Sequence, residues 1–259
     1  MSTISNYIAP DERAGELRTI SHAVVKKDAK GLLQGRAVYT NDLAPRDAYI
    51  VRLLRSPHAH ARIHSIDTHR ALRIDGIVAI YTYEDVPHAR YTLAGQSFRE
   101  MSPYDTLILD RTVRYVGDEV AIVVGTDELA INAAMRLIKV DYEVLPAVHN
   151  PSEAWAENAP LVFDEEESNV QAYKHIARGD ADTAIKNSKY VISQHFETPW
   201  TEHAFLEPEC AVSYIDPDGY VMVLSTDQSS HTTLHECKLL LGSDKVRVQN
   251  QLVGGGFGG

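Results

Sequence analysis

The chain has 259 residues, of which 44% are hydrophobic and 24% are charged, so it is long enough for one or two domains with a sizeable core. Its formal net charge is −11, and it contains no block of basic residues. This acidic balance argues against nucleic acid and against an anionic membrane surface as partners.

Location and redox state can also be predicted. The first residues of the chain have neither an apolar core nor a run of positive charge, so we expect no secretory signal. Since no apolar run reaches the roughly 18 residues of a membrane span, we expect a cytoplasmic protein. Cys210 and Cys237 lie far apart and form no Cys-x-x-Cys motif, so neither a disulfide framework nor an iron–sulfur site is predicted here.

The first half of the chain has the pattern of an α/β domain. Residues 1–18 are polar and are expected to form an N-terminal arm. Residues 19–148 alternate between strand and helix patterns. Strands are expected at 48–56, at 75–87, where Asp85 and Pro87 break the pattern, and at 140–146.

One strand and one helix of this half are predicted in more detail. The run EVAIVVG at 119–125 is continuously apolar and closed by a glycine, which is typical of a strand buried on both faces. Thr126 is expected to cap the helix that follows, with acidic residues in its first turn. The buried stripe of this helix is predicted to be Ala130, Ala133, Ala134, Leu137 and Ile138.

The second half has the pattern of an α+β unit. An acidic stretch with proline and asparagine at 149–169 is expected to be a linker, and residues 170–259 the first, incomplete part of a second domain. Strands are expected at 190–200, 210–216, 220–226 and 245–253, and a helix at 231–242 that ends at Gly242. The Pro-Asp-Gly turn at 217–219 predicts an antiparallel hairpin.

The sequence LVGGGFGG at 252–259 indicates a ligand-binding loop. Gly254, Gly256 and Gly259 satisfy G-x-G-x-x-G after a predicted strand, but neither the helix nor the acidic residue of a dinucleotide site follows. The Lys-Ser/Thr pair of a P-loop is absent as well. A nucleotide site and a plain flexible tail are the alternatives. We expect backbone amides presented at close range to a polar, bulky group, with the Phe257 ring beside it.

Several motifs together resemble one known family. GGGFGG resembles the pterin- and molybdenum-contacting loop of the molybdenum hydroxylases, the xanthine dehydrogenase and aldehyde oxidoreductase group. The resemblance runs from about residue 19 to the last residue, in the family's order. It implies a hammerhead-type α/β domain followed by the start of a molybdenum-cofactor-binding α+β domain, both from the large subunit. The other motifs are the segment 35–43, LLRSPHAHARIHSID (53–67), GIVAIYTYEDVP (76–87), the segment 113–148 and TEHAFLEPECAV (201–212).

The resemblance implies an activity and its cofactors. The expected reaction is oxidation of an electron-poor C–H carbon with water, first of a purine such as xanthine or hypoxanthine. Another N-heterocycle such as nicotinate, an aldehyde, and a non-catalytic scaffold role remain alternatives. The expected cofactor is a molybdenum–pterin, either molybdopterin or its cytosine dinucleotide form.

The same resemblance implies that the chain is active only within a complex. The cofactor would be shared with a chain carrying the rest of its domain, including the general base. Iron–sulfur clusters and FAD are expected on separate subunits.

Five site residues follow from the resemblance. Gln228 is expected to be catalytic, because a carboxamide N–H stabilises an anionic oxo ligand where a carboxylate would repel it. Asp227 competes for this role, but the spacing to Gly242 fits Gln228; the alternative is a surface glutamine in a turn. The expected cofactor-binding residues are Gln228, Gly255, Gly256, Phe257 and Gly258.

Two groups of polar residues receive a structural interpretation instead. The segment EHAFLEPE offers Glu202, His203, Glu207 and Glu209 for acid–base chemistry, but we expect it to be mostly architectural. The histidines His58, His60 and His64 lie in a segment that resembles a metal-free part of the family, and His231 and His235 lack a third ligand, so no metal-ligating residues are predicted.

Overall fold

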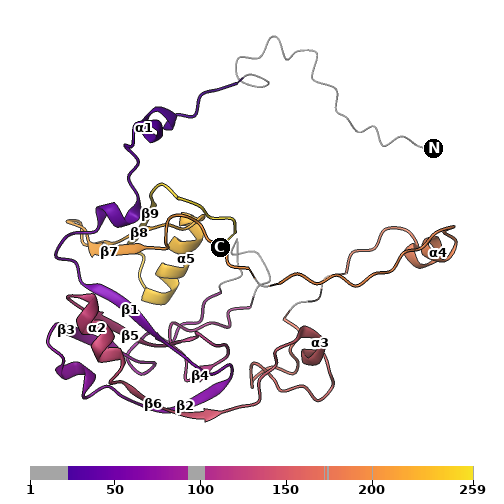
Figure 1. Cartoon of the computed structure of the whole chain (residues 1–259), viewed down its shortest axis with the longest axis horizontal. Coiled ribbons are helices and arrows are strands. Elements are labelled where there is room, and N and C mark those ends of the chain that lie inside the picture. Colours follow the sequence, from indigo (N-terminus) through magenta and orange to yellow (C-terminus); the bar gives the residue numbers. More distant parts are fainter. Residues whose placement is uncertain (1–22, 93–102, 172, 174, 200, 259) are drawn as a thin grey trace.

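The computed structural model describes residues 23–92, 103–171, 173, 175–199 and 201–258 (Figure 1). The predicted arm at 1–18 and Gly259 of the glycine-rich motif lie outside these residues. A short helix α1 (Ala29–Leu33) and a 3₁₀ turn η2 (Thr40–Leu43) lead into the first sheet. In the described part of the chain, no helix is long and apolar enough to cross a membrane.

The first sheet is antiparallel, with β5 (Glu119–Gly125) between β1 (Ile50–Arg55) and β3 (Ile77–Tyr81). On one face of β5, Val123 packs in a core with Ala71 of the 3₁₀ turn η3 (Ala71–Arg73) and with the helix that follows β5. On the other face, Val120 packs against the second sheet. The prediction that this strand is buried on both faces is confirmed.

The second sheet has the order β4 (Thr112–Val113), β2 (Ala61–Asp67) and β6 (Lys139–Val144). Strand β6 was predicted from its pattern, but its place was not. Although β5 and β6 are joined by a single helix, they lie in different sheets, and β6 pairs antiparallel with β2, with Ile63 opposite Tyr142. Two small sheets therefore enclose the core of this half.

Helix α2 (Glu128–Met135) corrects two details of the prediction. Its cap is Asp127, whose Oδ1 accepts a hydrogen bond from the Ala130 amide at 2.9 Å, whereas the Thr126 hydroxyl donates to the Gly76 carbonyl. The helix buries Ala130, Ile131 and Ala134, and it leaves Ala133 exposed. The predicted buried face of the helix therefore differs from the observed one. The helix is short, and its packing against β5 determines which of its residues are buried.

The middle of the chain contains the main error of the sequence prediction. The strand expected at 190–200 is not formed over 190–199, where the residues are exposed and carry no strand pairing. In Figure 1 this segment projects away from the sheets with helix α4 (Ala181–Lys186) at its tip, beyond helix α3 (Pro151–Ala154). An alternating pattern forms a strand only where another strand offers an edge, and the described chain offers none here.

The third sheet contains β7 (Ala211–Ile215), β8 (Val221–Ser225) and β9 (Val246–Asn250), with helix α5 (Ser230–Leu241) between the last two. The predicted hairpin of β7 and β8 is confirmed, with Gly219 at φ +80° in its turn. Strands β8 and β9 are parallel, which requires the crossover that α5 supplies. As predicted, α5 stops at Gly242, which adopts a left-handed φ of +58°.

The close fit of β5 against α2 predicts a stability effect at Gly125. A Cβ added there would lie 2.7 Å from Ile131 Cγ1 and 3.0 Å from the Gly76 carbonyl oxygen. We expect Gly125→Ala to lower the free energy of unfolding by about 1–3 kcal/mol, as overpacking usually does. Urea denaturation followed by circular dichroism would measure this.

Gly31→Ala is the matched control for this prediction. An added Cβ at Gly31, inside α1, would meet nothing within 4 Å, so its effect is expected to be neutral or stabilising by up to about 1 kcal/mol. Equal unfolding free energies for the two variants would contradict the packing described for β5.

Candidate functional site

The carboxyl ends of β8 and β9 bring Gln228 and the glycine loop, residues 254–258, to one place. Because the two strands are parallel, both segments leave the sheet at the same edge. The Gln228 carboxamide lies directly on the Gly256 backbone, since a Cβ built on Gly256 would be 2.5 Å from Gln228 Cδ and 2.6 Å from its Oε1. The structure therefore joins two of the predicted site residues that are 28 positions apart in the sequence.

Each of the first three glycines of this loop has a side chain where its own Cβ would be. Glu207 Cβ lies 2.5 Å from the Cβ position of Gly254, Phe205 contacts that of Gly255, and Gln228 contacts that of Gly256. The glycine run is thus required by the packing of the chain itself. The sequence analysis did not select Phe205, because a glycine run implies close neighbours without identifying them.

The end of the glycine loop, residues 257 and 258, is exposed to solvent. Phe257 adopts an unusual positive φ of +48°, and 76% of its surface is exposed. Gly258, at φ +89°, is exposed and has nothing within 4 Å of its Cβ position. Of the predicted site residues, Gln228, Gly255 and Gly256 are packed together, while Phe257 and Gly258 present ring and backbone to solvent.

Asp227, the alternative to Gln228 for the catalytic role, is fixed by a network of hydrogen bonds. Its carboxylate accepts from the Ser225 hydroxyl at 2.5 Å, the Ser229 amide at 2.6 Å, the Thr233 hydroxyl at 2.8 Å and Asn250 Nδ2 at 2.8 Å. Burial raises the pKa of Asp227, but these hydrogen bonds outweigh burial and hold the pKa below its usual value. The carboxylate ties together the ends of β8 and β9 and the start of α5.

The electrostatics of this edge suit a negatively charged or strongly polar group. The side chain of Gln228 is exposed and uncharged, and its carboxamide offers N–H donors. Helix α5 begins at Ser230, two residues further on, so the positive end of its dipole lies at the same edge. The charge of Asp227 is stabilised by hydrogen bonds from within the chain.

The polar segment at 202–209 is mostly occupied by local contacts. The Glu202 carboxylate accepts from the Ala204 amide at 2.5 Å, and the His203 ring stacks at 6.0 Å on that of Phe205. Glu207 accepts from the Gly254 amide, and Glu209 is exposed. No pair among these residues has the arrangement of a general acid and base.

The histidines singled out in the sequence have separate surroundings. His60 Nδ1 lies 2.8 Å from the Pro146 carbonyl oxygen, and the His58 ring packs edge-on against Tyr142. His235 Nε2 lies 3.4 Å from the Tyr104 hydroxyl. Among the residues that the structure describes, no group of three His, Cys, Asp or Glu side chains could hold a metal ion.

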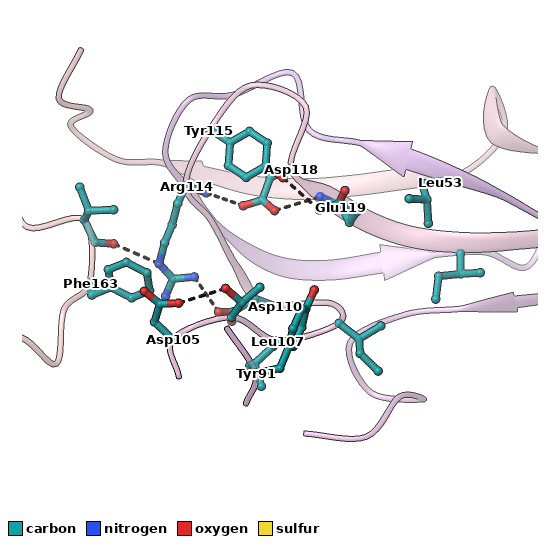
Figure 2. Close-up of a pocket in the computed structure, with 14 residues that line it drawn as sticks. Leu53, Tyr91, Asp105, Leu107, Asp110, Arg114, Tyr115, Asp118, Glu119 and Phe163 are labelled. Atoms are coloured by element: carbon teal, nitrogen blue, oxygen red, sulfur yellow. Dashed lines mark hydrogen bonds and ion pairs between the residues drawn. The ribbon is translucent and has the colours of Figure 1, made fainter. Parts of the chain in front are cut away.

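A cavity of about 510 Å³ lies in the first half of the chain, but none of the predicted site residues line it (Figure 2). Arg114 crosses it, donating to Asp110 at 2.6 Å and to the Val162 carbonyl at 3.1 Å, with its guanidinium over the Phe163 ring. Burial raises the pKa of Asp118, although this carboxylate accepts from the Arg114 amide. These groups satisfy one another, so the cavity is a structural junction that anchors residues 162–163.

Two protein families match successive parts of the chain. The family described as "Aldehyde oxidase and xanthine dehydrogenase, a/b hammerhead domain" matches residues 34–146, and the "Molybdopterin cofactor-binding domain" matches residues 162–259. The probable hypoxanthine oxidase XdhD of Escherichia coli (strain K12) is 31% identical over 97% of this chain and 30% of its own length. The nicotinate dehydrogenase large molybdopterin subunit of Eubacterium barkeri is 30% identical over 91% of this chain and 54% of its own length.

Solved structures extend the comparison to the fold. The crystal structure of quinoline 2-oxidoreductase from Pseudomonas putida 86 superposes with a TM-score of 0.79 and 27% identity, covering 91% of this chain and 30% of that one. Fold and site together define an α/β hammerhead domain joined to part of a molybdopterin cofactor-binding domain.

The chain belongs to the molybdenum hydroxylase family, the xanthine dehydrogenase and aldehyde oxidoreductase group, and corresponds to the N-terminal part of its large subunit. The predicted family and fold class are therefore confirmed. The chain spans about 30% of the length of the first curated relatives that it matches.

The network around Asp227 predicts a pH-dependent loss of stability. Asp227→Asn removes the charge that four donors share, and we expect it to lower the free energy of unfolding near pH 7 by about 1–3 kcal/mol. Because the folded-state pKa is lowered, the stabilisation is complete above the unfolded-state pKa of about 3.9 and is lost as pH falls through the folded-state pKa. Denaturant titrations from pH 3 to 7 would check this.

Asp244→Asn is the control for that experiment. The Asp244 side chain is 97% exposed and forms a surface ion pair with Lys238, so its loss is expected to change stability by less than about 1 kcal/mol. A difference between wild type and Asp227→Asn that stayed constant across the pH range would contradict the role assigned to the carboxylate.

Proposed function

We propose that the protein carrying this chain is a molybdenum-cofactor-dependent hydroxylase that oxidises an electron-poor C–H carbon with water. A purine such as hypoxanthine or xanthine is the preferred substrate. The observation that carries the proposal is the contact of the Gln228 carboxamide with Gly256 at the carboxyl edge of two parallel strands. The match with the molybdopterin cofactor-binding domain and the likeness to a probable hypoxanthine oxidase support it.

The residues at this edge fit an anionic cofactor. They supply a neutral carboxamide and a helix N-terminus. At Gly258, which has no Cβ, a ligand can also approach the backbone closely. Gln228, Gly255, Gly256, Phe257 and Gly258 would hold the group. When bound, the molybdenum–pterin cofactor supplies the two-electron oxidation of the substrate carbon.

The chain's own residues would bind and orient rather than move protons. Gln228 would donate an N–H to a negatively charged ligand oxygen, and its neutral side chain would avoid the repulsion that a carboxylate would cause. The exposed Phe257 ring would form one wall of the substrate's approach. The general base would come from the remaining part of the cofactor domain.

The proposal includes an assembly and a domain division. The cofactor, molybdopterin or its cytosine dinucleotide form, would be completed by the rest of its domain, and iron–sulfur and FAD subunits would carry the electrons away. The domains would be an arm at 1–18, a hammerhead domain at 19–148, a linker at 149–169 and the start of the cofactor domain at 170–259. The match at 34–146 supports the hammerhead domain, and the match at 162–259, which begins inside the proposed linker, supports a cofactor domain after it. A cytoplasmic location stays a prediction.

A second substrate class has a specific observation in its favour. The likeness to a nicotinate dehydrogenase covers 91% of this chain, so oxidation of a pyridine-type heterocycle is the first alternative. Aldehyde oxidation and a scaffold role rank behind it. Molybdenum and pterin analysis of the purified complex separates the scaffold role from all catalytic ones, and turnover of hypoxanthine, nicotinate and an aldehyde separates the substrates.

Substitution of Gln228 tests the proposed site in the assembled enzyme. Gln228→Ala removes one preorganised donor, and we expect kcat to fall by a factor on the order of 10²–10³. Gly256→Ala is expected to change kcat in the same direction, because its Cβ would occupy the place of the Gln228 carboxamide. Steady-state kinetics together with the molybdenum content per protein would measure both effects.

Gln249→Ala provides the matched control, since Gln249 is an exposed glutamine on β9. Its kcat and molybdenum content are expected to equal those of the wild type. A Gln228→Ala enzyme with the kinetics of the Gln249→Ala enzyme would contradict the assignment of Gln228.

A further inference from the structure

We infer that Glu207 is a positioning residue that fixes the first residue of the glycine loop and thereby sets where Gly256 meets Gln228. This inference rests on the proposed function of the loop. Glu207 Oε2 accepts a hydrogen bond from the Gly254 amide at 2.5 Å, and the contact is partly buried. A hydrogen bond to a carboxylate is about twice as strong as one between neutral groups.

The segment before Glu207 is shaped to make this contact. Ala204 has a positive φ of +50°, which a non-glycine residue rarely adopts, and its amide is held by the Glu202 carboxylate. Beyond this turn, Phe205 and Glu207, two residues apart, both face the glycine loop: the first covers Gly255 and the second covers Gly254. Segment 204–207 thus forms one wall of the loop.

Gln228, from a different part of the chain, covers Gly256. Three consecutive glycines are therefore each covered by a side chain, Gly254 by Glu207, Gly255 by Phe205 and Gly256 by Gln228. The Glu207 contact combines packing with a hydrogen bond from the Gly254 amide. If the Gly254 amide were released, the backbone could shift along its length, and the distance between Gly256 and Gln228 would no longer be fixed.

The second carboxylate oxygen indicates that stability alone does not explain a glutamate here. Within the described residues, Glu207 Oε1 is buried and has no hydrogen-bond partner, and an unpaired buried polar atom destabilises the fold. The side chain lines a cavity of about 560 Å³ between the two halves of the chain, to which Tyr39, Asn41 and Arg52 also contribute. Glu207 thus accepts from the Gly254 amide although its second oxygen is buried and unpaired in the described part of the chain.

Hydrogen exchange at the Gly254 amide tests the inference directly. The measurement uses the protein purified from its native host. We expect Glu207→Ala to speed exchange of this amide on the order of tenfold, because one charge-assisted hydrogen bond is lost. Glu207→Gln keeps an acceptor oxygen at the same reach, so exchange should stay within about threefold of the wild type. Mass spectrometry of peptides that differ at residue 254 would resolve the site.

Glu209→Ala is the matched control, because Glu209 is an exposed glutamate of the same segment, and it should leave Gly254 exchange unchanged. If Glu207→Ala does not fold, Glu207→Asp, which keeps the charge but shortens its reach, should show the faster exchange instead. Unchanged exchange in the alanine and aspartate variants, equally fast exchange in Glu207→Gln, or the same effect in Glu209→Ala would each overturn the inference.

The readout is independent of turnover. If the protein holds no molybdenum but Glu207→Ala still speeds exchange of the Gly254 amide, the proposed function is contradicted and the positioning role is supported. If the protein binds molybdenum and turns over substrate, but substitution of Glu207 does not change Gly254 exchange, the proposed function is supported and the positioning role is contradicted. In the loaded enzyme we also expect kcat to fall in Glu207→Ala and to be restored in Glu207→Gln.

Discussion

The parallel pairing of β8 and β9 is the constraint on which the candidate site depends. Parallel strands need a crossover, and α5 provides it, so three segments end or begin at one edge of the sheet. The Asp227 carboxylate holds these three ends together through donors on each of them. Because this edge is fixed, Gln228 and the glycine loop lie in contact.

The glycine run is then explained by contacts with other side chains of the protein. In the sequence, consecutive glycines suggest flexibility or the close approach of a ligand. In the structure, Gly254, Gly255 and Gly256 are each covered by a side chain of the same protein, whereas Gly258 is open. The loop is therefore seated on the protein along its first half and exposed along its second, which leaves the Phe257–Gly258 backbone available to a ligand.

The hammerhead half has its own core and contacts the second half directly. Its two sheets enclose their own core, and β5, buried on both faces, connects them. Contacts from this half reach the second one at two places, through Tyr39 close to Gly254 and through Tyr104 near His235 on α5. One of these contacts, that of Tyr39, lies beside the glycine loop.

Local sequence features determined much of this protein. The apolar run of β5, the turn at 217–219 and the left-handed end of α5 at Gly242 each depend on neighbouring residues, and each was predicted where it occurs. The family could be inferred because several such motifs follow one another in a fixed order. The choice of Gln228 over the adjacent Asp227 depended on its spacing to Gly242 and on the preference for a carboxamide, and it stays a prediction.

Only the tertiary structure decided which elements face one another. A hydrophobic period tells which side of a strand or helix is buried but not what covers it, so the placement of β5 and β6 in different sheets and the burial of Ile131 instead of Ala133 were not predictable. The alternating segment at 190–199 stayed unpaired because pairing requires an edge that its own residues cannot supply. The contacts of Phe205 and Glu207 with the glycine loop join residues nearly 50 positions apart, and only the folded sheet sets that distance.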